Sequence, residues 1–253
     1  MDTRNYADIN AKTIDRWVRD GWEWGVPIDH EAYIKAKNGD WDVLLTPIIP
    51  VPKTWFPGLR DIRLLGLASG GGQQMPVFAA QGARCTVLDY ADSQLAGEKM
   101  VAEREGYSMD MVKADMSKPL PFEDGLFDMI FHPVSNCYVE DVYHVWRECF
   151  RVLKKGGVLL AGMDNGFNFL FDDTDTPPLT VTHKLPFNPL KDPLLYEKYV
   201  ATDGVQFSHS LEEQIGGQLK AGFILTDLYE DRDRAGILPQ YAPQYIATRS
   251  VKP

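Results

Sequence analysis

The residues of this chain best suited to chemistry follow the ends of short apolar runs. The stretch GLASGGGQQ, residues 66–74, joins one such run to a helix-like segment. Three successive glycines in that place predict that the backbone approaches a ligand closely. The N–H groups of such a loop can hold an anionic group such as a carboxylate. Which ligand that is, or whether the loop is only a tight turn, these nine residues leave open.

Two acids end the next two apolar runs. Asp89 follows Gly70 by 19 residues, the placement of a carboxylate that accepts hydrogen bonds from ribose hydroxyls. Asp115 lies in KADM, where its carboxylate can accept from an adenine amino group while Met116 gives apolar contact to the ring. A helix cap or surface acid is the alternative for Asp89, and a turn acid for Asp115. Together with the glycine loop they favour a nucleoside-containing ligand.

The elements that must position these residues alternate between strand and helix. The expected strands are 63–68, 83–90, 110–114, 126–132, 158–163, 223–229 and 244–250. The expected helices are 73–81, 93–105, 142–153 and 210–221, the last beginning at a capping box of Ser210 and Glu213. This order predicts an α/β fold, with a doubly wound, mostly parallel sheet of seven strands. The last two strands lack a helix between them, so one late strand is expected to be antiparallel.

Two further segments do not follow this alternation of strands and helices. Residues 1–59 hold five of the six tryptophans and are expected to form a helical cap, which either covers the ligand as a lid or only packs on the sheet. Aromatic walls there would exclude water and hold a planar or cationic group. Within the main domain, residues 60–253, a segment rich in proline and aromatic residues at about 164–209 is expected to be an insertion near the carboxyl ends of the strands.

Composition narrows the class of protein. The 253 residues carry 26 Lys and Arg against 36 Asp and Glu, a net charge of −10, which disfavours nucleic-acid binding. Three widely spaced cysteines predict neither a disulfide framework nor a zinc site. Acids at 172, 173 and 175 are expected to be a solvated turn, so no metal is expected. The polar first residues and the lack of a long apolar run predict a cytoplasmic protein without a membrane segment. Oligomeric state is not readable.

Four stretches taken together resemble a family. GLASGGGQQ, VLDY, VKADMSKPLPFEDGLFDMIFH and FRVLKKGGVLLAGM are similar to successive motifs of class I S-adenosylmethionine-dependent methyltransferases, nearest the methyltransferase type 11 group. The resemblance covers about residues 60–163. It implies a Rossmann-like fold, S-adenosylmethionine as cofactor, and methyl transfer to a small-molecule acceptor.

The resemblance also implies a set of residues that contact the cofactor. Ser69 and Gly70 would lie against its methionine part, Asp89 at the ribose, Asp115 and Met116 at the adenine, and His132 below the sulfonium. The full expected set is Ala68, Ser69, Gly70, Gln73, Gln74, Asp89, Tyr90, Ala114, Asp115, Met116 and His132. The chain departs from the family at Gly66, where an acid is usual, and at Ala68, where glycine is usual. Gln73 or Gln74 would then anchor the methionine ammonium through an amide oxygen, or both are helix-surface amides.

The segment after the fourth strand, HPVSNCYVED, concerns the acceptor. It matches neither the Asn/Asp-Pro-Pro-Tyr pattern of amino-group methylation on adenine or glutamine nor the Pro-Cys pattern of cytosine methylation, which again disfavours nucleic acid. His132, Asn136 and Tyr138 are the candidate catalytic residues, with a structural, backbone-bonded histidine as the alternative. Sulfonium methyl transfer can rely on positioning and desolvation, so an acid–base pair is not obligatory.

Two other functions stay open at this point. An NAD-linked oxidoreductase also uses a glycine loop followed by an acid, but no GxGxxG follows the first strand. The only Tyr-x-x-x-Lys, residues 33–37, precedes the expected sheet. A non-catalytic cofactor-binding protein would keep the same fold without turnover.

Overall fold

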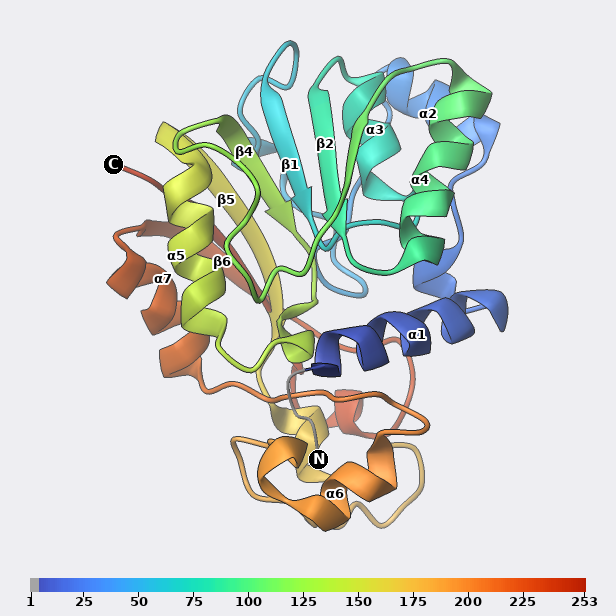
Figure 1. The fold of residues 1–253 in the computed structure, drawn as a ribbon, viewed down its shortest axis with the longest axis vertical. Helices are drawn as coiled ribbons and strands as arrows, with labels where there is room; N and C mark the ends of the chain where they lie inside the picture. The colour runs from blue at the N-terminus through green and yellow to red at the C-terminus, as the bar shows by residue number, and fades with distance from the viewer. Residues whose placement is uncertain (1–4) are drawn as a thin grey trace.

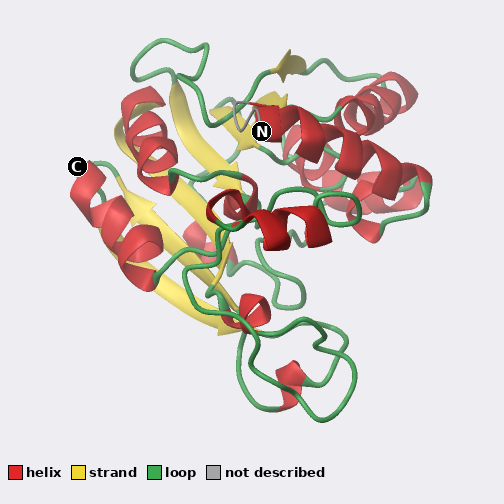
Figure 2. Ribbon diagram, turned by 60° about the horizontal axis from the view of Figure 1, so that its bottom comes forward, coloured by secondary structure: helices red, strands yellow, loops and turns green. Residues whose placement is uncertain are grey.

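A seven-stranded sheet with helices on both faces forms the centre of the molecule (Figures 1 and 2). The computed structural model describes residues 5–253. The strands are β1 (Arg63–Leu67), β2 (Arg84–Asp89), β3 (Asp110–Lys113), β4 (Phe127–His132), β5 (Leu153–Asp164), β6 (Ile224–Asp231) and β7 (Tyr245–Val251). The helices are α1 (Tyr6–Arg19), α2 (His30–Lys37), α3 (Gln74–Ala80), α4 (Asp92–Glu105), α5 (Val142–Val152), α6 (Pro193–Tyr199) and α7 (Gly217–Ala221).

The strand order confirms the predicted sheet. It runs β3-β2-β1-β4-β5-β7-β6, and β1 to β5 pair in parallel. Strand β7 is antiparallel to both of its neighbours, β5 and β6, so the expected late reversal is confirmed. The order reverses direction between β1 and β4. Ligands of open α/β sheets bind at such a switch point, beyond the carboxyl ends of the strands.

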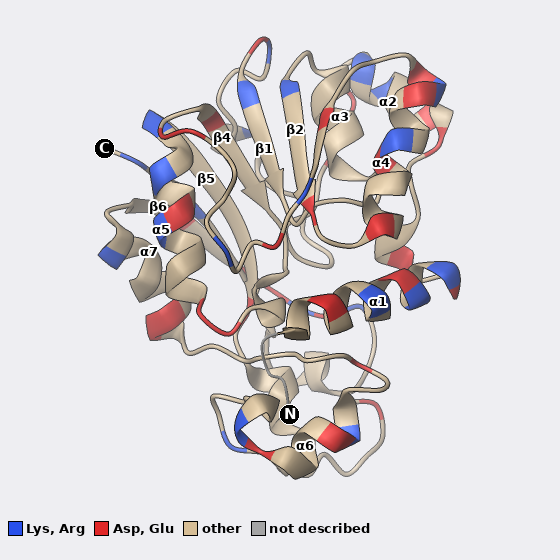
Figure 3. Cartoon of the chain, viewed as in Figure 1, with Lys and Arg blue, Asp and Glu red and all other residues tan. Residues whose placement is uncertain are grey.

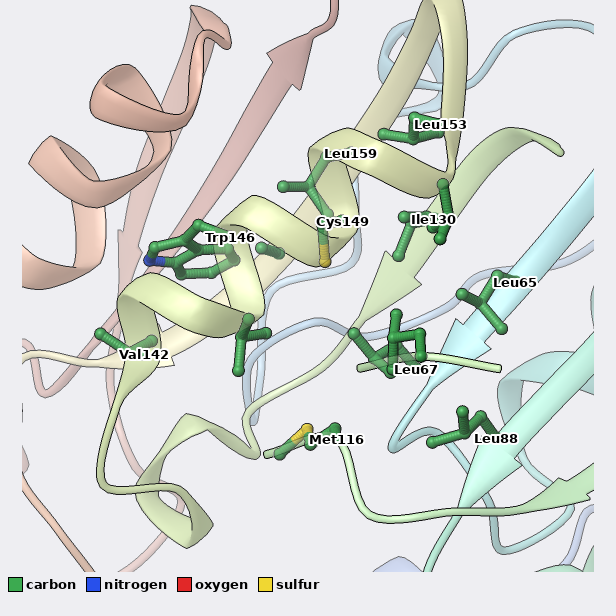
Figure 4. Close-up of a cluster of buried hydrophobic side chains, with 14 of the residues drawn as sticks. Leu65, Leu67, Leu88, Met116, Ile130, Val142, Trp146, Cys149, Leu153 and Leu159 are labelled. Carbon is green, nitrogen blue, oxygen red and sulfur yellow. The ribbon is translucent and has the colours of Figure 1, made fainter. Parts of the chain in front are cut away.

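Each face of the sheet carries its own apolar core, because successive strand residues point to opposite faces. Leu65 and Leu67 of β1 face α5, whose buried stripe includes Trp146 and Cys149 (Figure 4). Leu64 points the other way, into a cluster with α3 and residues from the N-terminal segment and α2. The buried side of α5 also packs against Ile130 of β4 and Leu159 of β5.

Two boundaries differ from the predictions. Strand β5 begins at Leu153, which pairs with Phe127, and a register shift follows before the regular pairing of Val158 with Met129. Helix α5 therefore ends at Val152, one residue before the predicted end, and Gly156 and Gly157 lie within the irregular start of β5. The late helix opens with the predicted capping box, in which Ser210 N donates to Glu213 Oε2 at 2.8 Å. Its first turn is a π-helix, Glu212–Gly216, before α7 begins.

The N-terminal helix and the 164–209 segment lie together at the carboxyl ends of the strands (Figure 1). Asn10 of α1 donates to Val205 O at 2.9 Å and accepts from Val205 N at 2.7 Å, as a neighbouring strand would. Arg16 donates to the carbonyl oxygens of Ala201 and Thr202. These hydrogen bonds join residues nearly 200 positions apart in the sequence. They hold α1 against the end of the 164–209 segment.

Candidate functional site

The glycine loop is packed against the protein itself. Gly70 N donates to Asp89 Oδ2 at 3.1 Å, Gly71 N to Gln94 O at 2.9 Å, and Gly72 N to Glu98 Oε1 at 2.8 Å. Two of these N–H groups therefore hold carboxylates, as expected of such a loop, but the carboxylates are those of Asp89 and Glu98. Contact of the loop with a ligand stays a prediction. The glycines are needed for close packing, since a Cβ at Gly71 would lie 2.6 Å from Trp24 O.

Asp89 stands at the centre of the site, at the end of β2. Its Oδ1 accepts from Tyr90 N at 2.8 Å and from Ala91 N at 3.1 Å, and Oδ2 accepts from Gly70 N. Burial raises the pKa of this carboxyl, and the three backbone N–H groups oppose the rise. The two oxygens together offer about four acceptor sites, so capacity for a further donor remains, chiefly at Oδ2. The side chain lines the two cavities described next, so it can receive hydroxyl groups from either side.

A narrow cavity of about 60 Å³ lies between α1 and the ends of β2 and β3. Its lining includes Tyr90, Ala114, Asp115 and Met116, four of the expected cofactor contacts. Asp115 Oδ1 accepts from Ser117 N at 2.8 Å, and this hydrogen bond orients the carboxylate in the turn that follows β3. The lining is mostly apolar and includes two carboxylates, those of Asp89 and Asp115.

A larger cavity of about 270 Å³ continues on the other side of Asp89. It shares Ile14, Ala68, Asp89 and Tyr138 with the narrow cavity, so the two form one elongated site. Its lining includes five of the expected residues at this end: Ala68, Ser69, Gly70, Gln73 and Gln74. The buried Ser69 Oγ finds no hydrogen-bond partner among residues 5–253, which leaves it for a ligand.

The two amides after the loop have different surroundings. Gln73 Nε2 donates to Glu23 O at 2.7 Å and Val26 O at 3.0 Å, so this side chain fastens the N-terminal segment to the loop. Gln74 is buried and lines the larger cavity, and its side-chain amide forms no hydrogen bond within residues 5–253. Gln74 is therefore the amide free to hold a polar ligand group.

One of the two departures from the family pattern has a local cause. Ala68 adopts a φ of 48°, the left-handed region that favours glycine, which accounts for the family's glycine but does not explain the alanine. A Cβ at Gly66 would collide with the Sδ of Met75, a fully buried residue of α3. Met75 therefore fills the space that an acid at position 66 would need, and the chain has no carboxylate there.

Gly66→Ala is expected to lower the free energy of unfolding by about 1–3 kcal/mol through overpacking. In a Met75→Ala background the same substitution should be nearly neutral, because the obstructing side chain is gone. Guanidinium unfolding of the four proteins in a double-mutant cycle measures the difference. An equal cost in both backgrounds would contradict the account of Gly66.

His132 and Asn136 lie one layer beneath the cavity wall. Both side chains are fully buried. His132 Nδ1 donates to Leu67 O at 2.8 Å, and Nε2 lies 2.8 Å from Asn136 Oδ1. The Asn136 amide continues to Gln214 at 2.8 Å, and burial lowers the pKa of His132. Neither residue lines a described cavity, whereas Tyr138 lines both parts of the elongated site.

The roof of the larger cavity comes from the N-terminal segment. Trp22 and Trp24 line it together with residues 44–47. Arg234, from the β6–β7 connection, stacks 4.9 Å from the Trp24 ring and pairs with Glu23. Its Nε also donates to Pro47 O at 2.8 Å. His30 pairs with Glu105 at 2.9 Å outside the cavity.

Glu98 supports the loop from α4. It is fully buried, and burial raises its pKa to about 8. A carboxyl whose folded pKa exceeds its ordinary value of 4.5 binds more protons when folded. Its contribution to stability therefore falls as pH rises from about 4.5 to about 8.

Glu98→Gln keeps an oxygen for Gly72 N and cannot ionise. Between pH 6 and pH 8.5, wild type is expected to lose more stability than this variant. Guanidinium unfolding at the two pH values measures the change, with Glu103→Gln on the exposed face of α4 as control. Parallel pH profiles of wild type and Glu98→Gln would refute this role.

Several lining residues were missed by the sequence analysis. They are Gln94, Leu44, Leu45, Thr46, Pro47, Cys137, Gln206 and Tyr245. Gln94 had a readable signal, since it shares one face of α4 with Glu98 four residues later. The others reach the site through tertiary contacts from the two ends of the chain.

Among residues 5–253, no group of three or more His, Cys, Asp or Glu side chains is arranged to hold a metal ion. Asp173 accepts from Asp175 N at 2.7 Å, a turn contact. None of the helices described is both long and apolar enough to cross a membrane. Acidic and basic residues are interspersed over the outer helices (Figure 3).

Comparisons with known proteins identify the family of this chain and its fold. A methyltransferase-domain family model matches residues 65–161. The uncharacterized methyltransferase YbaJ of Bacillus subtilis (strain 168) is 44% identical over 251 residues, 96% of this chain and 97% of that protein. The ubiquinone/menaquinone biosynthesis C-methyltransferase UbiE of Bartonella tribocorum is 35% identical over 110 residues, 42% of each chain.

A solved S-adenosylmethionine-dependent methyltransferase from Mesorhizobium loti shares the fold. The match has a TM-score of 0.60 and 16% identity, and covers 79% of this chain and 94% of that one. The expected fold and cofactor are those of the matching family. This chain therefore belongs to the same methyltransferase family as YbaJ and has the fold of S-adenosylmethionine-dependent methyltransferases.

Proposed function

We propose that this chain methylates a small-molecule acceptor and that S-adenosylmethionine lies in the elongated site centred on Asp89. The observation that carries the proposal is the junction of the two cavities at this carboxylate, beyond the ends of β1 and β2. S-adenosylmethionine has an adenine at one end, a ribose in the middle and a polar methionine chain at the other end. The narrow cavity, Asp89 and the larger cavity follow one another in the same order.

Each part of the site has a proposed role. The adenine lies between α1 and Met116, with Asp115 accepting from its amino group. Asp89 accepts from the ribose hydroxyls. The methionine end lies against Ala68, Ser69 and Gly70, where Gln74 and Ser69 supply polar contacts. Tyr90 and Ala114 border the adenine, and Gln73 keeps the roof in place.

Bound S-adenosylmethionine supplies an electrophilic methyl carbon. The chain's own residues position the acceptor in line with it and exclude water, the two contributions that such a transfer needs most. The Trp22 and Trp24 side chains cover the site from above, and Tyr138 borders both of its halves. His132 and Asn136 hold the end of β4 through their buried contacts, and we assign them a positioning role.

We further infer that residues 1–59 act as a cap on the 60–253 domain and that the 164–209 insertion completes it. The hydrogen bonds of Asn10 and Arg16 support this division, since they join the first helix to the insertion. The acidic balance of the chain favours a small-molecule acceptor over nucleic acid. We also propose a cytoplasmic location.

Titration calorimetry with S-adenosylmethionine, S-adenosylhomocysteine and NADH tests the cofactor. We expect one site for each sulfur compound. Binding of NADH with no response to either sulfur compound would refute the proposal. A homocysteine-release assay over a broad panel of acceptors then tests turnover, and release above the acceptor-free rate is the expected result.

A further inference from the structure

A separate cavity of about 380 Å³ lies between the strand ends and the insertion. It shares Val134, Cys137, Gln206 and Tyr245 with the larger cofactor cavity, so the two adjoin. A molecule held there would have its reactive end next to the methionine part of the elongated site. The inference below rests on the proposed function and concerns what this cavity binds.

The walls of this cavity are aromatic and acidic. The aromatic side chains are Phe169, Phe171, Phe187, Tyr199 and Tyr245, and the acids are Asp164, Asp172, Asp203 and Asp233. His183 is the one basic side chain among the lining residues described. Aromatic faces attract cations, and uncompensated carboxylates do so more strongly. The cavity therefore favours a flat, apolar molecule that carries a positive or protonatable group.

Two of the acids already have partners across the cavity wall, and Asp203 accepts from the adjacent Thr202 hydroxyl at 2.7 Å. Asp172 accepts from Lys198 and Tyr199 and lies 2.8 Å from His183 Nε2, and the lysine contact holds its pKa well below the usual range. Asp233 Oδ2 accepts from the Tyr245 hydroxyl at 2.9 Å. These two groups shape the cavity, and they have less capacity left for a ligand.

Asp164 differs from both. It ends β5, is only 4% exposed, and its Oδ1 accepts from Gly166 N at 2.9 Å. Its Oδ2 is buried and finds no donor within residues 5–253. Burial raises the pKa of this carboxyl to about 7, so it can gain or lose a proton near neutrality. A buried carboxylate oxygen without a donor is costly unless a ligand supplies one.

We propose that the acceptor is a small amine with a flat apolar body, held in this cavity, and that Asp164 takes the proton that its nitrogen releases. The aromatic walls receive the body, and the unpartnered Oδ2 faces the N–H group.

The step balances with these groups alone. The lone pair of the neutral amine forms the new nitrogen–carbon bond as the carbon–sulfur bond breaks. The sulfur keeps that electron pair and becomes a neutral thioether, while the nitrogen becomes positively charged. Its proton passes to Asp164 Oδ2, which leaves a neutral methylated amine and a neutral carboxyl.

Other titratable groups also face Asp164. Cys137 and Tyr245 lie against it from neighbouring elements, and burial raises the pKa of both. Asp172, His183, Asp203 and Asp233 line the same cavity. Since ionised Asp164 is the form that attracts an amine, amine binding is expected to strengthen as pH rises from 6 to 8.

The test uses the full chain loaded with S-adenosylhomocysteine. Calorimetry measures binding of 2-phenylethylamine and of 2-phenylethanol, which has the same body without the amine. We expect the amine to bind about 10- to 100-fold more tightly, the scale of a hydrogen bond to a charged group. Asp164→Asn, which keeps the acceptor for Gly166 N, should abolish that preference. Asp175→Asn, on the exposed part of the insertion, should retain it.

Equal binding of amine and alcohol, or an unchanged preference in Asp164→Asn, would overturn the proposal. The pH dependence of amine binding to wild type gives a second readout that does not depend on the variant folding, and a flat profile would also overturn it. The cofactor titration comes first on the same sample. A missing response to S-adenosylhomocysteine therefore identifies failure of the proposed function, while normal cofactor binding without amine preference identifies failure of this inference alone.

Discussion

Replacing Asp89 by alanine is expected to weaken S-adenosylhomocysteine binding by about 1–3 kcal/mol, or roughly 5- to 150-fold. The proposed contact is a pair of charge-assisted hydrogen bonds from the ribose hydroxyls, and alanine leaves both hydroxyls unpartnered. Asp89 lines both cavities of the site, so no neighbouring carboxylate can replace it from the same position. Titration calorimetry measures the affinity.

The control must separate binding from folding, because Asp89 also accepts three backbone N–H groups. Asp89→Asn keeps acceptors for some of these groups, and thermal unfolding without cofactor shows what each variant costs the fold. Asp92→Ala, in the same turn but paired with Lys113 on the surface, should bind the cofactor normally. Full affinity in Asp89→Ala would remove this residue from the site.

Gly71→Ala is expected to disrupt both stability and cofactor binding. Gly71 has a φ of 97°, and an added Cβ would lie 2.5 Å from Gln94 Oε1 and 2.6 Å from Trp24 O. The left-handed backbone alone costs alanine about 1–2 kcal/mol, and overpacking adds about 1–3 kcal/mol. Relief of the crowding would push the Trp24 segment away from the loop and open the roof of the cavity.

Gly39→Ala provides the matched comparison. Gly39 has nearly the same conformation, with a φ of 93°, but nothing lies within 4 Å of its added Cβ. Guanidinium unfolding should therefore show the larger loss for Gly71→Ala, and calorimetry should show weakened cofactor binding only there. Equal losses in the two variants would mean that the loop does not depend on its contact with the N-terminal segment.

The sheet and the nucleoside end of the site were predictable from sequence because they depend on local order. Apolar runs separated by amphipathic segments define the strands, and the acids that end β2 and β3 must emerge at the same edge of a parallel sheet. Asp89, Asp115 and Met116 accordingly line adjoining cavities. Whether they bind the cofactor stays a prediction.

The other features of the site could not be predicted, because they depend on contacts between residues far apart in the sequence. Three glycines signalled a close approach of backbone, but not that the approach is to Gln94, Glu98 and the Trp24 segment. Burial of His132 and Asn136 likewise follows from α5 and Gln214 packing over them. The sequence marks Asp164 only as the start of an insertion, because its burial depends on contacts with Cys137 and Tyr245.

A crystal structure with S-adenosylhomocysteine tests the central claim most directly. The account predicts the adenine between α1 and Met116, the ribose hydroxyls on Asp89, and the sulfur facing the cavity that contains Asp164. Density for the nucleoside anywhere outside the elongated site, or a sulfur directed away from that cavity, would contradict it.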